Sequence, residues 1–327
     1  METSSAAPTH YLVLLGGVLA VASSSITIRL VQQSGMPATM IAAGRLGFAA
    51  LILLPIALVR VRPELRALSR RDLALGLCAG AFLAIHFIAW ISSLEYTSVA
   101  SSVALMATIP LWVGIAALVL FRERLVPLML LAILLTIGGS ALIAFSDGSG
   151  RNAKNALLGD GLALLGALMA SAYFLIGRSL RRRHSTLAYI WLAYTSTAII
   201  LIVLAFVGQR NGLVDQRPLV DYPPAAYALL LGLAIGPQLL GHSAFNWALR
   251  YLSATFISVV TLGEPIAAAL LALAIFGERF APLQFLGFFL LLLGIIAAAR
   301  VERTQAAPIS RNTTRILPPR HKDTKAW

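Results

Sequence analysis

The feature that most constrains this chain is a series of ten apolar stretches, each close to the length that crosses a lipid bilayer. An α-helix of about 20 apolar residues spans the hydrocarbon core of a membrane. Hydrophobic residues make up 59% of the chain and charged residues only 12%, which is more apolar sequence than a soluble core can use. The sequence therefore predicts an all-α polytopic membrane protein, with transmembrane helices at 11–31, 38–59, 73–93, 98–120, 127–145, 157–177, 187–207, 226–248, 254–276 and 282–300.

Lysine and arginine are distributed unevenly between the two sets of loops that these helices create. Of the 26 basic residues, nineteen fall in one set of loops together with the C-terminal segment, six in the opposite set and one, Arg45, inside a span. Cytoplasmic loops are enriched in lysine and arginine. We therefore expect a multi-pass protein of the cytoplasmic (inner) membrane with both termini in the cytoplasm. This placement also accounts for the net charge of +13 without a nucleic-acid partner.

The second half of the chain repeats features of the first half at a constant separation of 155 residues. The aligned pairs are Tyr96 with Tyr251, Ser98 with Ser253, Pro110 with Pro265, Phe121 with Phe276, Glu123-Arg124 with Glu278-Arg279, and Pro127 with Pro282. Since each half holds five spans, an odd number, the second half must enter the membrane from the opposite side. Paired spans interrupted by proline are a sequence indicator of transporters built from inverted repeats.

These observations predict two inverted five-helix repeats, with a substrate site between them. The first repeat covers residues 11–145 and the second covers residues 157–300. A polar linker, residues 146–156, joins them. We expect residues 1–10 and the basic cytoplasmic tail, 301–327, to be disordered, because they hold too few apolar residues to fold.

Glu264 and Pro265 stand about ten residues inside an apolar span, near the predicted centre of the membrane. A carboxylate at that depth costs at least ~2.5 kcal/mol, so it normally faces a protein interior or a water-filled cavity. Glu264 is therefore a proton-coupling candidate: its protonation would favour a state closed to water, since desolvation penalises the charged form. Pro265 removes a backbone donor beside it. Together with Pro110, it is a candidate hinge.

Arg45 lies about seven residues, or roughly 10 Å, inside the predicted outer end of its helix. A guanidinium at that depth needs partners. It could bind an anionic group of a substrate, or it could be a structural partner of backbone carbonyls or of Glu264.

Two further groups of polar and aromatic residues share helix faces. His86 and Trp90 are four apart in the span 73–93, and Gln238, His242 and Asn246 recur every fourth residue in the span 226–248. We predict substrate binding for these five residues together with Arg45. The alternatives are interhelical hydrogen bonds for the polar side chains and an interfacial aromatic position for Trp90.

Signatures of enzymes and pumps are absent from the sequence. It contains no phosphate-binding Gly-Lys-Ser/Thr loop, no paired-histidine zinc motif and no serine elbow, and its one cysteine is Cys78. We therefore predict no catalytic residue, no metal site, no cofactor and no enzymatic activity. Transport driven by ATP hydrolysis within this chain is not expected.

The combined pattern resembles the drug/metabolite transporter superfamily, in particular its EamA-type members with ten helices in two inverted repeats. The residues that carry the resemblance are 42–46 (AAGRL), 96–100 (YTSVA), 121–125 (FRERL), 262–265 (LGEP) and 276–279 (FGER). The resemblance implies movement of small metabolites, often amino acids or related compounds, by alternating access around a central cavity. The first helix departs from the family, because residues 22–25 (ASSS) replace a frequent Trp-Gly pair.

The predicted function is a secondary transporter that exports a small amphipathic or zwitterionic metabolite. Arg45 would hold an anionic group, Trp90 would pack against the substrate, and Glu264 would accept a proton or an amino group. The predicted partners are a small-molecule substrate, protons and membrane lipids, and the oligomeric state is left open. The alternatives are a non-transporting membrane protein, such as a structural subunit or an intramembrane enzyme, and a flippase for lipid-linked precursors.

Overall fold

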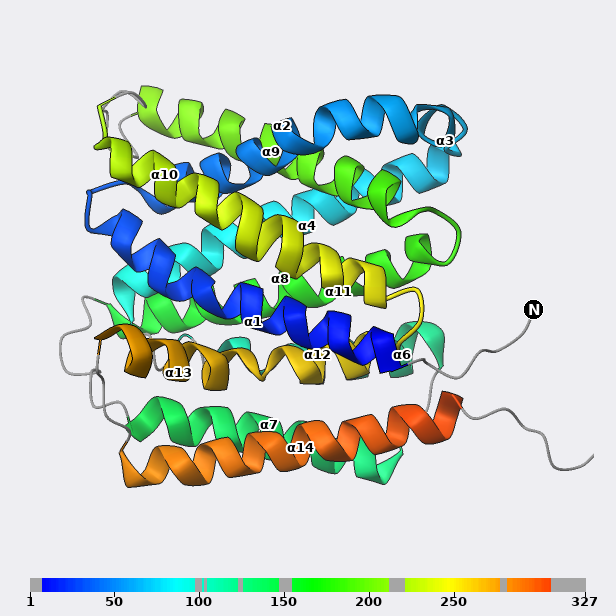
Figure 1. Ribbon diagram of the computed structural model, residues 1–327, viewed down its shortest axis with the longest axis vertical. Coiled ribbons are helices and arrows are strands. Elements are labelled where there is room, and N and C mark those ends of the chain that lie inside the picture. Colours follow the sequence, from blue (N-terminus) through cyan, green and yellow to red (C-terminus); the bar gives the residue numbers. More distant parts are fainter. Residues whose placement is uncertain are drawn as a thin grey trace, which may run out of the picture.

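The computed structural model describes residues 8–97, 102, 105–122, 126–146, 155–211, 221–276 and 281–306, and the regular secondary structure in these ranges is helical. The helices run roughly parallel or antiparallel to one another and form a stack (Figure 1). They are α1 (Pro8–Gln32), α2 (Ala38–Arg60), α3 (Arg62–Arg66), α4 (Arg70–Tyr96), α6 (Ile109–Phe121), α7 (Pro127–Ser146), α8 (Ala156–Arg181), α9 (Thr186–Arg210), α10 (Pro224–Leu233), η2 (Ala234–His242), α11 (Ser243–Ala248), α12 (Ala254–Thr261), α13 (Glu264–Phe276) and α14 (Pro282–Ala306).

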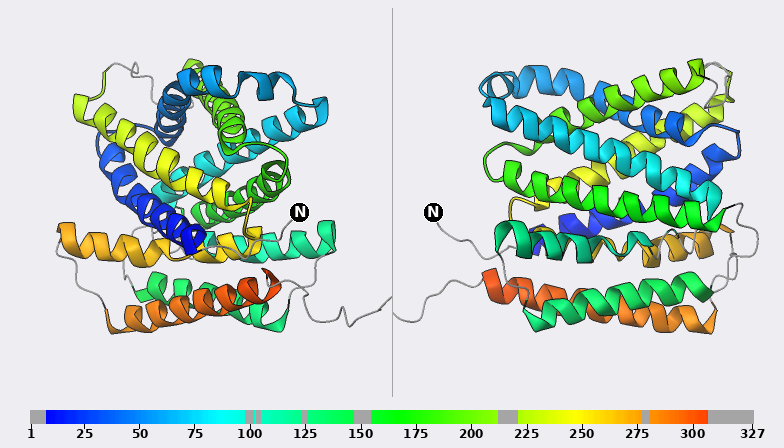
Figure 2. Two further views of the ribbon diagram at one scale, coloured as in Figure 1. Left: turned by 45° about the vertical axis from the view of Figure 1, so that its right-hand side comes forward. Right: turned by 180° about the vertical axis from the view of Figure 1, so that it is seen from behind.

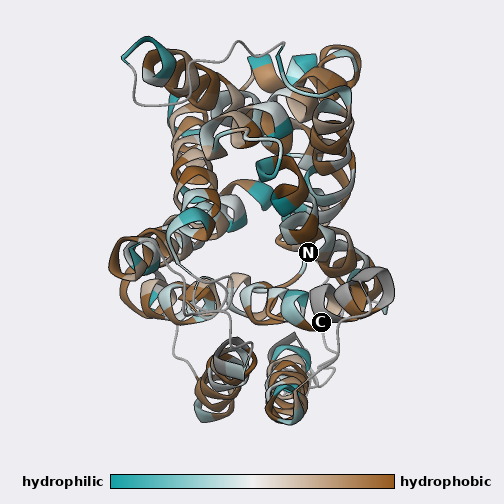
Figure 3. Cartoon of the chain, turned by 90° about the vertical axis from the view of Figure 1, so that its left-hand side faces the viewer, coloured by the Kyte–Doolittle hydropathy of each residue, from teal (hydrophilic) through white to brown (hydrophobic). Residues whose placement is uncertain are grey.

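Within the described ranges, seven helical segments are long and apolar enough to cross a membrane, and three shorter apolar helices accompany them. Large hydrophobic side chains such as Leu51, Val59 and Phe206 point outward along these segments. Hydrophobic residues predominate over most of the helices when the molecule is seen along their axes (Figure 3). An outer surface of this kind is stable in lipid and not in water. The chain is a multi-pass membrane protein, and its helices are compatible with the ten predicted spans.

Several helices begin at a serine or asparagine that caps the first turn. The side chain of Ser69 accepts a hydrogen bond from the backbone N–H of Asp72 (3.0 Å). Asn155, Ser185 and Ser253 do the same for α8, α9 and α12. Such a cap satisfies a backbone donor that has no partner inside the helix. Local sequence therefore fixes where these helices begin.

Close helix contacts are made at glycines. A Cβ atom on Gly80 of α4 would lie 1.8 Å from the hydroxyl of Ser196 on α9. In the antiparallel pair α7 and α14, a Cβ on Gly139 would lie 2.6 Å from the carbonyl of Gly287, and one on Gly294 would lie 2.8 Å from that of Ala132. These two helices lie side by side and form a layer of their own in all views (Figures 1 and 2).

Two short helices start deep inside the bundle instead of at its ends. α12 ends at Thr261 and α13 begins at Glu264, so the predicted span 254–276 is interrupted two residues before Pro265. α6 begins at Ile109, which precedes Pro110 and lies 155 residues before Glu264. From the middle of the molecule, α6 and α13 run to opposite ends (Figure 1). This opposite direction is what inverted repeats require.

The predicted span 226–248 is not one regular α-helix. Its middle part, η2 (Ala234–His242), is a π-helix of nine residues with Pro237 inside it. Proline lacks the N–H that an α-helix needs, and a wider turn is one way to accommodate this loss. The three polar residues of this span nevertheless remain close to one side, because four residues make nearly one turn of either helix.

One end of the bundle gathers the N-terminus of α1, the C-terminus of α14, α3 and the connection between α8 and α9 (Figure 1). We call it the basic end, because it carries the arginines of residues 60–71, 178–183 and 300–303. Asp72 there forms an ion pair with Arg183 (2.8 Å) and contacts His184 (3.0 Å). Both oxygens of Glu64 accept hydrogen bonds from the backbone and hydroxyl of Ser185, at 2.6 Å each.

The C-terminal helix extends beyond its predicted end. Residues 301–306, which we assigned to the disordered tail, continue α14. Glu302 is buried, and its carboxylate accepts hydrogen bonds from the backbone N–H (2.6 Å) and hydroxyl (2.5 Å) of Ser253. The prediction of disorder at residues 301–306 was wrong because Glu302, which makes this segment look polar, is paired with Ser253 in the folded chain. Residues 1–7, 98–101, 103–104, 123–125, most of the linker, 212–220, 277–280 and the tail after residue 306 lie outside the described ranges.

Candidate functional site

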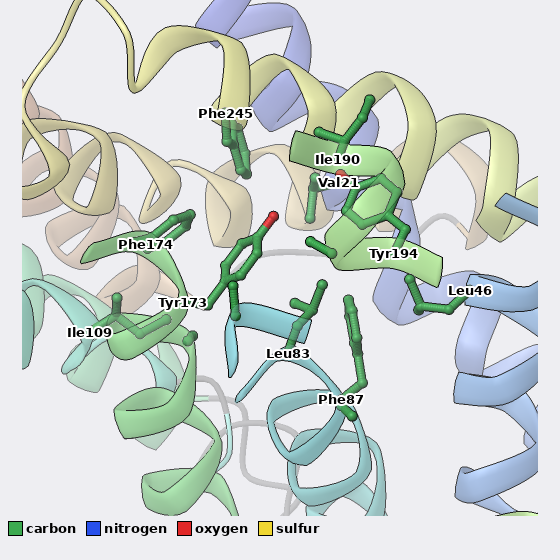
Figure 4. Packing of buried hydrophobic residues seen from close by; sticks show 14 of the residues in the cluster. Val21, Leu46, Leu83, Phe87, Ile109, Tyr173, Phe174, Ile190, Tyr194 and Phe245 are labelled. Atoms are coloured by element: carbon green, nitrogen blue, oxygen red, sulfur yellow. The ribbon is translucent and has the colours of Figure 1, made fainter. Parts of the chain in front are cut away.

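A cavity of about 130 Å³ lies among α1, α4, α6, α8, η2, α11 and the α12–α13 break. Six of its lining residues, Val21, Leu83, Ile109, Tyr173, Phe174 and Phe245, are visible in the close view (Figure 4). The full lining is Val21, Ala22, Ser25, Leu83, His86, Trp90, Met106, Ala107, Ile109, Ala170, Tyr173, Phe174, His242, Phe245, Thr261, Leu262, Glu264 and Pro265. The cavity therefore draws on both predicted repeats.

Glu264 is the first residue of α13 and lines this cavity. Within the described part of the chain, its carboxylate has neither a hydrogen-bond partner nor an ion-pair partner. Pro265 follows it and also lines the cavity, whereas Pro110 occupies the equivalent second position of α6 next to Ile109. The break in the helix thus delivers a carboxylate to the interior of the bundle.

His86 and Trp90 form one side of the cavity from α4. The Nδ1 atom of His86 lies 2.9 Å from the backbone carbonyl oxygen of Gly166. A carbonyl can only accept, so in the neutral imidazole Nδ1 carries the hydrogen and Nε2 is a free acceptor. The rings of His86 and Trp90 are nearly parallel, at 9°, with centroids 6.1 Å apart. This hydrogen bond and the neighbouring indole fix the orientation of the imidazole.

Arg45 is fully buried on α2 and is not part of the cavity lining. Its Nε donates to the side-chain oxygen of Gln238 (2.9 Å), and one terminal nitrogen donates to the hydroxyl of Ser24 (2.8 Å). The guanidinium also lies over the ring of Phe87, 4.5 Å from its centroid. Its other terminal nitrogen has no hydrogen-bond partner among the described residues. Arg45 and Glu264 do not form an ion pair in this structure.

Asn246 joins the cavity wall to this polar cluster. Its side-chain nitrogen lies within hydrogen-bond distance of the hydroxyls of Tyr173 (2.5 Å) and Tyr194 (3.2 Å) and of the carbonyl of His242 (2.8 Å), and its two hydrogens serve two of these three oxygens at a time. The Tyr194 hydroxyl in turn reaches the carbonyl of Gln238 (3.5 Å), a long and weak contact. Tyr173 and His242 line the cavity, whereas Gln238 and Asn246 are completely buried behind it.

The sequence-predicted residues thus divide into two groups. Glu264, His86, Trp90, His242 and Pro265 meet at the cavity. Arg45, Gln238 and Asn246 form the buried cluster behind it. Sequence reasoning did not select the aromatic residues Phe174 and Phe245 as site residues, because single aromatics in apolar helices carry no spacing signal.

Arg181 is a second buried arginine that the sequence did not single out. We had counted it among the basic loop residues, but it ends α8 and is only 1% exposed. It donates to the carbonyls of Asn246 (3.0 Å) and His184 and to the hydroxyl of Thr186. Its partners are mainly backbone carbonyls, which are invisible in a sequence. It holds α11 against the start of α9.

Comparison with known proteins agrees with this architecture. Residues 9–145 and 157–300 each match the model of the EamA-like transporter family. The uncharacterized transporter YxxF of Bacillus subtilis (strain 168) is 25% identical over 250 residues, which is 76% of each chain. The uncharacterized transporter YetK of the same organism is 24% identical over 309 residues, 92% of this chain and 91% of YetK.

A protein of known crystal structure has the same fold. It superposes with a TM-score of 0.71 at 17% sequence identity, over 91% of this chain and 98% of its own. The two family matches together cover most of the sequence, and both matched segments contribute residues to the cavity, in which the carboxylate of Glu264 has no partner among the described residues. The chain is a membrane transporter that belongs to the EamA-like transporter family, within the drug/metabolite transporter superfamily.

Proposed function

We propose that this protein is a secondary transporter that exports amino acids or related amphipathic compounds by alternating access. The observation that carries the proposal is the carboxylate of Glu264, which lines a cavity between apolar helices and has no partner among the residues that the structure describes. An ionisable group is costly at that place and is retained when it has a task, such as binding a substrate or a proton. The absence of nucleotide-binding motifs in the sequence supports a mechanism that uses an ion or substrate gradient.

The moving units in this proposal are two inverted repeats, residues 11–145 and 157–300, with ten spans in total. Two features support it: α6 and α13 start 155 residues apart and run in opposite directions, and α7 and α14 do the same. Rocking of one unit against the other would expose the cavity to each side in turn. Pro110 and Pro265, at the starts of α6 and α13, are the proposed hinges.

We place the protein in the cytoplasmic membrane with the basic end facing the cytoplasm. The nineteen basic residues on that side against six on the other support this orientation. Both termini would then be cytoplasmic. Export corresponds to loading of the cavity from the basic end and release at the opposite end.

The proposed site residues have different tasks. Trp90, His86 and His242 line the cavity and would contact the substrate directly. Arg45, Gln238 and Asn246 would act from behind, because their hydrogen bonds fix Tyr173 and the segment η2 that supplies His242. Glu264 would bind either the amino group of the substrate or a proton. Protonation removes its charge and therefore favours the state in which the cavity is closed to water.

The test is transport by the purified chain in sealed vesicles, with a proton gradient and an amino-acid mixture as probe. We expect pH-dependent flux in the wild type and flux without pH dependence, or none, in Glu264→Gln. Asp221→Asn is the matched control, because it also replaces a carboxylate by an amide, but at an exposed residue that does not line the cavity. Equal rates for Glu264→Gln and the wild type at every pH would contradict the coupling role.

A second measurement identifies the solute. Metabolite pools are compared between cells that overproduce the wild type and cells that overproduce the double variant Arg45→Ala, Glu264→Gln. A pool that falls only with the wild type names the exported class. Unchanged pools together with stoichiometric capture of a protein partner would instead favour a non-transporting role.

A further inference from the structure

We infer that the cavity selects amines over zwitterions: its preferred ligand is a monocation with a protonated amino group on an aromatic body and no carboxylate. The inference rests on the proposed transport function and narrows its substrate class to the related amphipathic compounds, because it ranks amines above amino acids as ligands. It follows from the charges, hydrogen-bonding atoms and ring faces that the described residues present to the cavity.

The formal charges on the side chains that line the cavity favour a cation. Glu264 supplies a carboxylate, and none of the described lining residues is a lysine or an arginine. The N-terminus of α13 carries a partial positive charge, but the C-terminus of α12, with the opposite partial charge, ends at the same break. These two partial charges largely cancel, and the N-terminus of α6 at Ile109 adds only a partial positive charge. The carboxylate therefore remains the main charge that a ligand meets.

The cation that could bind a carboxylate is shielded from the cavity. Arg45 is 0% exposed, is engaged by Ser24 and Gln238, and is stacked on Phe87. Its remaining terminal nitrogen has no hydrogen-bond partner among the described residues, but Arg45 does not line the cavity, so a ligand carboxylate could reach that nitrogen only if the packed side chains moved. A ligand carboxylate that does not pair with Arg45 would lie in an apolar cavity beside Glu264, where desolvation and like-charge repulsion both oppose binding.

His86 adds an acceptor. Because its Nδ1–H is directed to the carbonyl of Gly166, its Nε2 is the atom left for a ligand, and that atom accepts a hydrogen bond from an ammonium or hydroxyl group. Several lining residues carry donors that could meet a carboxylate, but these groups are neutral: Ser25, Trp90, Tyr173, His242 and Thr261. Neutral donors do not replace the full hydration of an ion. The hydrogen-bonding groups thus favour a donor ligand.

The remaining walls suit an aromatic body. Four aromatic residues line the cavity: Trp90, Tyr173, Phe174 and Phe245. The last three are labelled in Figure 4. Aromatic faces attract both other rings and cations. The volume of about 130 Å³ is about ten times what one buried water requires, which fits a small organic molecule and not a peptide.

Four probes that share one phenyl ring test the inference. They are 2-phenylethylamine, phenylalanine, 2-phenylethanol and 3-phenylpropionate, and equilibrium binding to the full chain in lipid nanodiscs is measured for each. We expect 2-phenylethylamine to bind at least about tenfold tighter than phenylalanine, with 3-phenylpropionate the weakest. In Glu264→Gln the preference for the amine over the alcohol should be lost. Glu264→Asp should retain part of it, and Asp221→Asn should retain all of it.

The outcomes separate this inference from the proposed function. Phenylalanine binding as tightly as the amine, no binding of any probe, or an unchanged preference in a folded Glu264→Gln protein would overturn the inference. Vesicles that then still carried amino acids would leave the proposed function in place. Amine binding by a protein that moved no solute across vesicles would do the reverse: it would support the inference and refute transport.

Discussion

The two helix breaks of this protein share a backbone arrangement but differ in chemistry. α6 and α13 begin 155 residues apart, each has proline as its second residue, and both starting residues line the same cavity. The first starts with Ile109 and the second with Glu264. The comparison shows that two similar helix breaks can contribute different chemistry to one cavity. Glutamate at the start of α13, where α6 has isoleucine, supplies the charge on which the proposed function depends.

The largest effect is expected at Glu264 itself. Glu264→Gln should reduce coupled transport by about 100-fold, equivalent to about 2.7 kcal/mol, and abolish its pH dependence. Ile109→Gln, which changes the equivalent position, should reduce the rate far less, because no charge is lost there. Initial rates in vesicles at several pH values measure both. Similar losses in the two variants would show that the breaks are equivalent in function.

At the contact between α7 and α14, in contrast, equivalent substitutions in the two helices should have similar effects on stability. Gly139→Ala and Gly294→Ala place a methyl group against the partner backbone of α14 and α7, so each should destabilise the protein by about 1–3 kcal/mol. Gly138→Ala is the control: a Cβ there meets nothing within 4 Å, and alanine is the better helix former. Denaturant unfolding in mixed micelles measures all three. A cost at only one of the paired glycines would contradict the symmetry of this layer.

Moving the charge from one break to the other is a sharper test. In the double variant Ile109→Glu, Glu264→Ile, the carboxylate still lines the cavity. We expect it to regain about tenfold in amine binding over Glu264→Ile alone, equivalent to about 1.4 kcal/mol. No recovery in a protein that unfolds like the wild type would mean that the surroundings of α13, and not only the charge, are required.

The smallest effects are expected at the two prolines. Each is the second residue of its helix, where the missing N–H would have no helical partner, so Pro110→Ala and Pro265→Ala should change stability by less than about 1 kcal/mol. If both act as hinges, each should slow transport severalfold without changing substrate affinity. Separate measurements of kcat and KM decide the matter. A loss of affinity alone would argue against the hinge assignment.

Helix positions and the break at Glu264 could be predicted because they depend on local sequence. Apolar length sets the spans, and a glutamate followed by proline inside one of them marks an interruption. The partners of Arg45 could not be predicted, because Ser24 and Gln238 are 21 and 193 residues away in sequence and belong to different helices. The sequence identified a buried guanidinium that needed partners, but it left open which ones.

The π-helix η2 and the buried Arg181 had only weak signals in the sequence, which helical periodicity does not detect. Gly236-Pro237 inside a span pointed to an irregular helix, and the structure has the π-helix η2 there. Arg181 was hidden within a run of loop arginines, and its burial depends on carbonyls supplied by distant segments. The order of residue types along the chain indicates how polar a segment is and how its apolar residues are spaced. It does not indicate which backbone group a long side chain can reach.

The hydrogen bonds between Glu302 and Ser253 have a consequence for biosynthesis. The ribosome makes Ser253 about fifty residues before its carboxylate partner, so the side-chain cap of α12 can form first, whereas the contact between this helix and α14 forms only after α14 has been translated and inserted. Docking of α12 is thus tied to arrival of the last described helix. A tag or truncation placed directly after residue 300 would interfere with the maturation of the distant cavity, although it touches no residue that lines it.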